Sequence, residues 1–147
     1  TMNWVLSTSR FSSKHATAYC AIVSSNGDMS YSGAAFNPMM VYSPAGDTFT
    51  SCDAGGVPVG ADRASKYVAK TIRLVPGSIG ICYSDGLVSA MNDRGDVYGF
   101  TRVKEILRSG KGKSPSDLTR LVFDDYNSFI DGRKQINDVS VIIFKHQ

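Results

Sequence analysis

The segment Ile79–Tyr83 constrains the fold of this chain more than any other. It is short, rich in apolar residues and opened by the turn pair Pro76-Gly77, so we expect a buried β-strand. Asp85-Gly86 follows almost at once, which places a carboxylate where a core strand ends. Burying a carboxylate costs free energy unless it is paired or bound to a cation. Asp85 therefore either starts an ordinary Asp-Gly turn or serves as a metal ligand or hydrogen-bond anchor.

Most of the other strand signals lie in the first half of the chain and are separated by tight turns. Asn26-Gly27 is a strong hairpin signal. Residues 16–24 are apolar on both faces, which predicts that this strand is central in its sheet. The first four strands together suggest a β-meander. The expected strands, besides the one described above, are residues 16–24, 29–34, 38–43, 48–52, 68–74 and 139–144.

Two helices are expected in the second half. Residues 101–109 have a one-sided apolar pattern and end at Gly110. Ser114 is typical of an N-cap, with Pro115 at the first helical position of the second helix. Residues 3–11 fit either the end of a helix or an irregular lead-in. The pattern as a whole predicts an α+β fold, with mostly antiparallel sheets and helices packed outside them.

Composition excludes several classes of protein. The 147 residues suffice for one domain with a core, so we expect residues 1–147 to form a single domain. A net charge of +3 without a dense basic stripe argues against a nucleic-acid partner. No run approaches the ~18 apolar residues of a membrane span, so membrane contact is not expected.

The three cysteines are far apart and odd in number, which supports neither a disulfide framework nor a zinc motif. Cys20 and Cys82 lie in apolar runs and are expected to be core thiols. Free thiols in a core suit a reducing compartment, which predicts a cytoplasmic protein.

Oxygen ligands offer the one chemistry that the residues favour. His15 and His146 lack the partners of a nucleophile triad. Asp85 follows one expected strand, and Asn137-Asp138 precede the last one; if the two strands are antiparallel neighbours, these side chains converge. Carboxylates and water are the usual ligands of Mg²⁺ and Mn²⁺. Two such ions about 3.5–4 Å apart can activate water and clamp a phosphoryl group. Taken alone, Asp138 is an ordinary loop residue.

Three segments resemble the stage II sporulation protein E family, the bacterial branch of the metal-dependent PPM-type (protein phosphatase 2C-like) serine/threonine phosphatases. The run from Gly33 to Gly60 is similar to the family's N-A-G-H-N-P-P followed by G-x-P-L-G. Residues 74–99 resemble L-x-P-G-D-x-l-l-l-Y-T-D-G-l-x-E-A-x-N, followed by G-x-x-F-G. Residues 137–143 match the closing D-D-I-T-L-L-V. The similarity runs from about residue 16 to the end of the chain.

The resemblance implies two packed, mostly antiparallel sheets flanked by helices. It implies a hydrolase that removes phosphate from serine or threonine with a metal-bound water at a two-metal Mn²⁺/Mg²⁺ centre. Asp85 matches the metal-binding Asp of the family, with Asn137 and Asp138 as candidate ligands at its final motif. Typical substrates in this branch are phosphorylated regulatory proteins such as anti-sigma-factor antagonists. The implied setting is bacterial signal transduction, in sporulation or sigma-factor control.

The chain also departs from the family pattern. The family's opening G-D-x-Y-D and D-V-x-G-H-G segments, which supply further ligands, do not occur. We therefore expect that the chain lacks the first strands and helix of the domain, and that natural sequence precedes Thr1. Asn137 replaces a charged ligand, and Ala35-Phe36 replaces Gly-His. These departures favour a second hypothesis, a non-catalytic phosphatase-like module that binds a partner protein. Exposed sheet edges would also allow a homo-oligomer.

Overall fold

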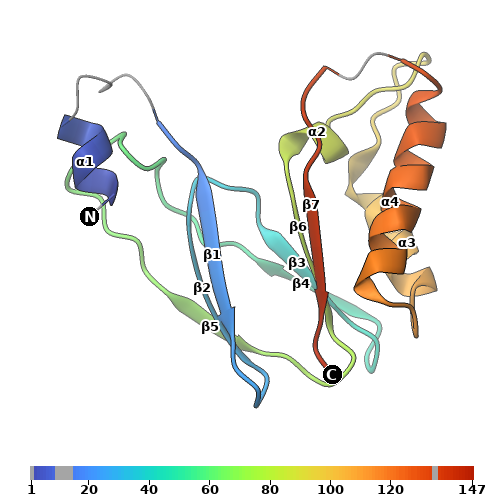
Figure 1. Ribbon diagram of the computed structural model, residues 1–147, viewed down its shortest axis with the longest axis horizontal. Coiled ribbons are helices and arrows are strands. Elements are labelled where there is room, and N and C mark those ends of the chain that lie inside the picture. Colours follow the sequence, from blue (N-terminus) through green and yellow to red (C-terminus); the bar gives the residue numbers. More distant parts are fainter. Residues whose placement is uncertain (1, 9–14, 134–135) are drawn as a thin grey trace. The chain divides into compact units, whose positions relative to one another are not determined.

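The computed structural model describes residues 2–8, 15–133 and 136–147. The chain divides into two compact units, each of which contains one of the two sheets (Figure 1). Unit 1 comprises Thr1–Pro38 and Cys52–Leu74, and unit 2 comprises Met39–Ser51 and Val75–Gln147. In the described part of the chain, no helix has both the length and the apolar character needed to cross a bilayer.

Unit 1 contains a three-stranded sheet in the order β1-β2-β5. Its elements are α1 (Met2–Thr8), β1 (Ala18–Val23), β2 (Asp28–Ala34) and β5 (Lys70–Arg73). Both pairings are antiparallel. The predicted Asn26-Gly27 hairpin is confirmed: Gly27 has a φ of 91°, and the Ser24 amide donates to the Asp28 carbonyl at 2.9 Å.

For residues 3–11 the sequence left a helix end or an irregular lead-in open. Helix α1 shows that the chain is helical as far as Thr8, and residues 9–11 lie outside the described part. Asn3 is the buried residue of this helix. Its Oδ1 accepts a hydrogen bond from the Gly60 amide at 2.8 Å, and its Nδ2 donates to the Asp62 carbonyl at 3.0 Å. These contacts join α1 to the segment that precedes β5 within unit 1.

Three expectations for the first half were wrong: a central β1, a core thiol at Cys20 and a β-meander. β1 is an edge strand with a largely exposed surface, whereas the central place belongs to β2, which pairs on both sides. Cys20 is accordingly exposed, while Cys82 is half-buried. The meander fails because β1 and β2 belong to one sheet and the next two strands belong to the other. Apolar residues on both faces raise strand propensity but do not determine the order of strands.

Unit 2 contains a four-stranded sheet in the order β4-β3-β6-β7. Its strands are β3 (Met39–Ser43), β4 (Thr48–Cys52), β6 (Ile79–Tyr83) and β7 (Val141–Lys145). β6 pairs antiparallel with both β3 and β7, and four of its five residues are buried. The expectation of a buried core strand is confirmed.

Three helices follow β6: α2 (Asp85–Val88), α3 (Gly99–Ser109) and α4 (Pro115–Ile130). The predicted cap of α4 is present, because Ser114 Oγ accepts a hydrogen bond from the Asp117 amide. Helices α3 and α4 pack on the sheet through one apolar cluster (Figure 1). Its buried members are Tyr42, Ile79, Ile81, Tyr83, Leu87, Tyr98, Val103, Leu107, Leu118, Val122 and Tyr126. The predicted α+β class, two antiparallel sheets with helices, is confirmed.

Candidate functional site

The ends of β6 and β7 meet at the point where the sequence places its acidic residues. Tyr83 on β6 is paired with Val141 on β7 in an antiparallel register. Asp85 lies just beyond the end of one strand, and Asn137 and Asp138 lie just before the other. The condition stated for convergence, that the two strands be antiparallel neighbours, is therefore fulfilled. All three side chains belong to exposed residues.

Ser84 joins the two segments through its side chain and its backbone. Its Oγ donates to the Asp138 carbonyl at 2.9 Å and accepts a hydrogen bond from the Ser140 amide at 2.9 Å. Its own amide donates to the Ser140 carbonyl at 3.0 Å. One serine thus fixes the backbone on both sides of Val139. Sequence reasoning missed this role, because nothing in the local sequence indicates a partner more than fifty positions away.

Asp85 is the first residue of α2, with Ser84 as the N-cap. This one-turn helix was not predicted. The Asp85 carbonyl accepts hydrogen bonds from the Ser89 amide at 3.0 Å and from Ser89 Oγ at 2.7 Å. The backbone of Asp85 is thereby fixed at the N-terminal end of the helical turn, just beyond the end of β6.

Gly86 permits the close approach of the two segments. It is buried, and a Cβ atom at this position would collide with the Asp138 carbonyl and lie 3.0 Å from the Asn137 carbonyl oxygen. Only glycine fits such a backbone contact without a shift. In the sequence, Gly86 indicated simply a flexible turn; its Asp-Gly context was the one available signal.

Two groups of β6 that border the site are neutral at neutral pH. Burial raises the pKa of the Tyr83 phenol, and the charges of Asp85 and Cys82 raise it further. Burial also raises the pKa of the Cys82 thiol. Protonated groups of this kind are poor nucleophiles, so the carboxylates and the amide are the chemically useful groups here.

The donor set fits a hard divalent cation by its chemistry. Asp85, Asp138 and Asn137 offer carboxylate and amide oxygens, which Mg²⁺ and Mn²⁺ accept together with water. The described residues contain no group of three or more His, Cys, Asp or Glu side chains that could hold a metal ion. Water or further protein ligands would therefore have to complete the coordination.

A family model described as stage II sporulation protein E (SpoIIE) matches residues 1–147. The chain belongs to this family. Among curated proteins, Protein IcfG of Synechocystis is 24% identical over 128 residues, which cover 86% of this chain and 20% of that protein. The family assignment rests on the match over the whole chain.

Solved structures show the same fold at low sequence identity. A structure of the PP2C phosphatase domain with a fragment of the regulatory domain of SpoIIE from Bacillus subtilis has a TM-score of 0.76 and 16% identity. It matches 97% of this chain, which covers 42% of that one. RsbX in complex with magnesium has a TM-score of 0.65 and 15% identity, with 96% of this chain and 59% of that chain covered. A structure of the Bacillus subtilis SpoIIE phosphatase domain presoaked with manganese also matches, with a TM-score of 0.65.

These comparisons confirm the expected PP2C-type phosphatase fold. The chain spans less than two thirds of the length of each of these relatives: 20% of Protein IcfG and 59% of the RsbX chain. The fold and family are therefore shared, while the activities of the longer proteins bear on this chain as proposals.

Proposed function

We propose that this chain is a metal-dependent protein serine/threonine phosphatase domain of bacterial signalling in the cytoplasm. Its substrate would be a phosphorylated regulatory protein, such as an anti-sigma-factor antagonist. The observation that supports this proposal is the junction of β6 and β7, where the segment that follows β6 contacts the segment that precedes β7, in a member of the SpoIIE family.

Asp85, Asp138 and Asn137 would hold Mn²⁺ or Mg²⁺, and a complete site would hold two ions. Such ions would polarise a phosphoryl group. They would also lower the pKa of a bound water molecule toward neutral, so that it becomes a nucleophile at neutral pH. Support comes from relatives whose structures include magnesium or were presoaked with manganese. Ser84 and Gly86 act on the site indirectly, because they hold the two ligand-bearing segments together.

The test is phosphate release from a phosphoserine peptide at millimolar Mn²⁺, with EDTA as the metal-free control. We expect Asp85→Asn to reduce turnover and Mn²⁺ affinity by about tenfold or more, because one charged ligand is lost. Asp124→Asn is the matched control: it makes the same change of charge at an exposed position on α4. Turnover that persists in EDTA, or an equal effect of both substitutions, would count against the proposal.

A second function remains supported by two observations. The described residues contain no cluster of three metal-binding side chains, and Asn137 brings no charge to the site. From these observations we infer an alternative to the phosphatase. In it, the chain is a non-catalytic phosphatase-like module that binds a partner protein or a second copy of itself. It predicts a folded chain with no phosphate release, and partner binding that EDTA leaves unchanged.

A further inference from the structure

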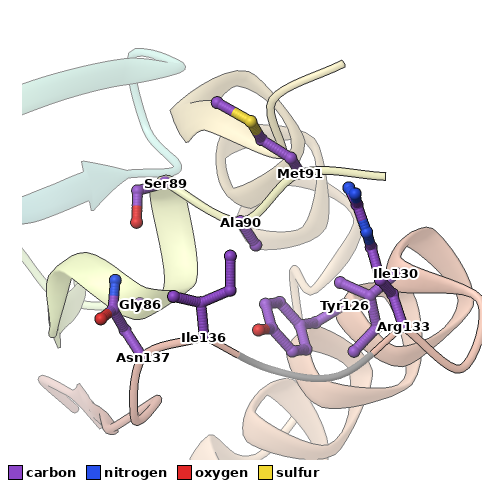
Figure 2. Close-up of a pocket in the computed structure, with 9 residues that line it drawn as sticks. All are labelled: Gly86, Ser89, Ala90, Met91, Tyr126, Ile130, Arg133, Ile136 and Asn137. Carbon is purple, nitrogen blue, oxygen red and sulfur yellow. The ribbon is translucent and has the colours of Figure 1, made fainter. Parts of the chain in front are cut away.

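A cavity of about 240 Å³ in unit 2 opens next to the candidate metal site (Figure 2). Its wall comes from α2, the segment that follows it, the C-terminal part of α4 and the segment before β7. The lining residues are Gly86, Ser89, Ala90, Met91, Tyr126, Ile130, Arg133, Ile136 and Asn137. The proposed phosphate removal uses Asn137 from this lining but gives no role to its apolar side chains, so these require their own explanation.

The lining is mostly apolar, and part of it is open to solvent. Met91 is 50% exposed and Ile136 is 89% exposed, although both are large apolar side chains. Figure 2 shows Ile136 and Tyr126 on the same cavity, with Ala90 facing it from the segment after α2. Apolar side chains that gather around a concave site favour an apolar occupant, because its binding removes their surface from water.

The cavity is continuous with the candidate catalytic site. Gly86 and Asn137 line it, and these residues also form the contact between the β6 and β7 ends. Ser89, another lining residue, donates its hydroxyl to the Asp85 carbonyl. A phosphorylated residue placed at Asp85 and Asn137 would therefore have its sequence neighbours at the mouth of the cavity.

Size and charge restrict the occupant. Pockets for cofactors and drug-sized ligands usually measure about 300–1,000 Å³, so this cavity suits a smaller group such as one large side chain. Arg133 is the single charged residue of the lining. Its Nη1 donates to the Asn92 carbonyl at 2.8 Å, and its Nε lies 3.4 Å from the Asp93 carboxylate. Arg133 is thus already paired, and the described residues of the lining include no carboxylate that could pair with an incoming basic side chain, so a neutral apolar side chain is favoured over lysine.

We propose that this cavity binds an apolar side chain of the phosphoprotein substrate, within a few residues of the phosphorylated serine or threonine. The cavity thereby selects the sequence around the phosphorylated residue. This inference rests on the proposed phosphatase function and adds the class of substrate sequence to it.

The experiment measures binding and turnover of fluorescent phosphoserine peptides that carry leucine or lysine at each of the flanking positions, in Mn²⁺. At one flanking position we expect the leucine peptide to bind about tenfold more tightly than the lysine peptide, because burial of the leucine side chain provides about that gain in affinity. Met91→Glu should remove this preference. Val97→Glu is the matched control, because Val97 forms a β-bridge with Met91 and is 51% exposed but does not line the cavity.

Hydrolysis of p-nitrophenyl phosphate, which carries no peptide side chain, separates the two proposals. We expect Met91→Glu to leave this turnover unchanged while it raises KM for the leucine peptide. The cavity assignment is overturned if leucine and lysine peptides bind equally, or if Met91→Glu and Val97→Glu have equal effects. Turnover of the small substrate would uphold the phosphatase function in that case. Absence of turnover with every substrate overturns the proposed function and this inference with it.

Discussion

The two sheets of this protein differ in how their strands are stabilised. In unit 1, β1 exposes five of its six residues, including Ile22 with 68% of its surface accessible. In unit 2, β6 buries four of its five residues, and the apolar cluster on its sheet includes α3 and α4. The exposed strand is held mainly by its backbone ladder, whereas the buried strand is also held by side-chain packing.

Side-chain hydrogen bonds to backbone carbonyls also hold unit 1 together. Tyr19 donates its hydroxyl to the Cys52 carbonyl at 2.8 Å, and Lys70 donates to the Asp53 carbonyl at 2.6 Å. Asn3 adds hydrogen bonds that anchor α1 to Gly60 and Asp62. The candidate site lies on the better packed sheet, at the end of its most buried strand. A site that must hold ligands in fixed positions benefits from such a rigid base.

The largest expected effect is on the core of unit 2. Leu107→Ala should lower the free energy of unfolding by about 3 kcal/mol. Leu107 lies on α3 and is fully buried in the apolar cluster, so removal of its side chain leaves a cavity. Ile22→Ala, on the exposed strand of unit 1, should cost about 1 kcal/mol or less. Urea unfolding of both variants tests the difference; similar losses would contradict the contrast between the sheets.

A smaller effect is expected where the site depends on close packing. Gly86→Ala should cost about 2 kcal/mol and weaken Mn²⁺ binding, because the new methyl group displaces the Asp138 backbone. Gly46→Ala is the control: its Cβ would meet only Thr48, at an ordinary contact distance of 3.6 Å. Thermal unfolding and calorimetric Mn²⁺ titration give the two readouts. Unchanged Mn²⁺ binding in Gly86→Ala would show that the junction does not position the ligands.

In unit 1, we expect the hydrogen bonds of Asn3 to stabilise the fold more than another polar side chain of the same helix does. Asn3→Ala should cost about 1–2 kcal/mol, since it leaves the Gly60 amide without its acceptor. Ser7→Ala, which removes a hydroxyl that donates to the Trp4 carbonyl of the same helix, should change stability by less than about 0.5 kcal/mol. Urea unfolding measures both. If Asn3→Ala costs no more than Ser7→Ala, the polar anchor of α1 contributes nothing to unit 1.

The smallest effect is the pH dependence of one exposed ion pair in each unit. A hydrogen bond from Arg73 holds the pKa of Asp28 below its usual value, and Arg108 does the same for Asp47. Because both folded pKa values are depressed, the stabilisation is present above the unfolded value of 3.8 and is lost as pH falls through the folded pKa. NMR titration of the two carboxylates should give midpoints below 3.8 in both units. A midpoint at or above that value would refute the corresponding ion pair.

Local chemistry explains which sequence predictions succeeded. The hairpin at Asn26-Gly27 and the cap at Ser114 depend on residues a few positions apart, and both are present. The buried strand Ile79–Tyr83 is apolar throughout and was correctly placed. Cys20 failed as a core thiol because its burial depends on the position of β1 in the sheet, which its own segment does not determine.

The candidate site illustrates the same limit. The chemical types of Asp85, Asn137 and Asp138 were evident from the sequence, and so was the condition under which they would converge. The one-turn helix α2, the double hydrogen bond of Ser84 and the backbone contact at Gly86 were not. The hydrogen bonds of Ser84 and the contact at Gly86 depend on a segment that lies more than fifty residues away along the chain, whereas α2 is a single turn closed by local hydrogen bonds that no sequence pattern signalled.

By itself, the sequence determined the turns, the caps and the most buried strand, because short-range sterics and burial act within a few residues; it also supplied the chemical types of the candidate oxygen ligands. The tertiary structure alone decided that β1 is an edge strand and that β6 lies beside β7. It alone formed the cavity beside Asn137. Strand order and cavities result from packing between distant segments, and such packing depends on the whole chain.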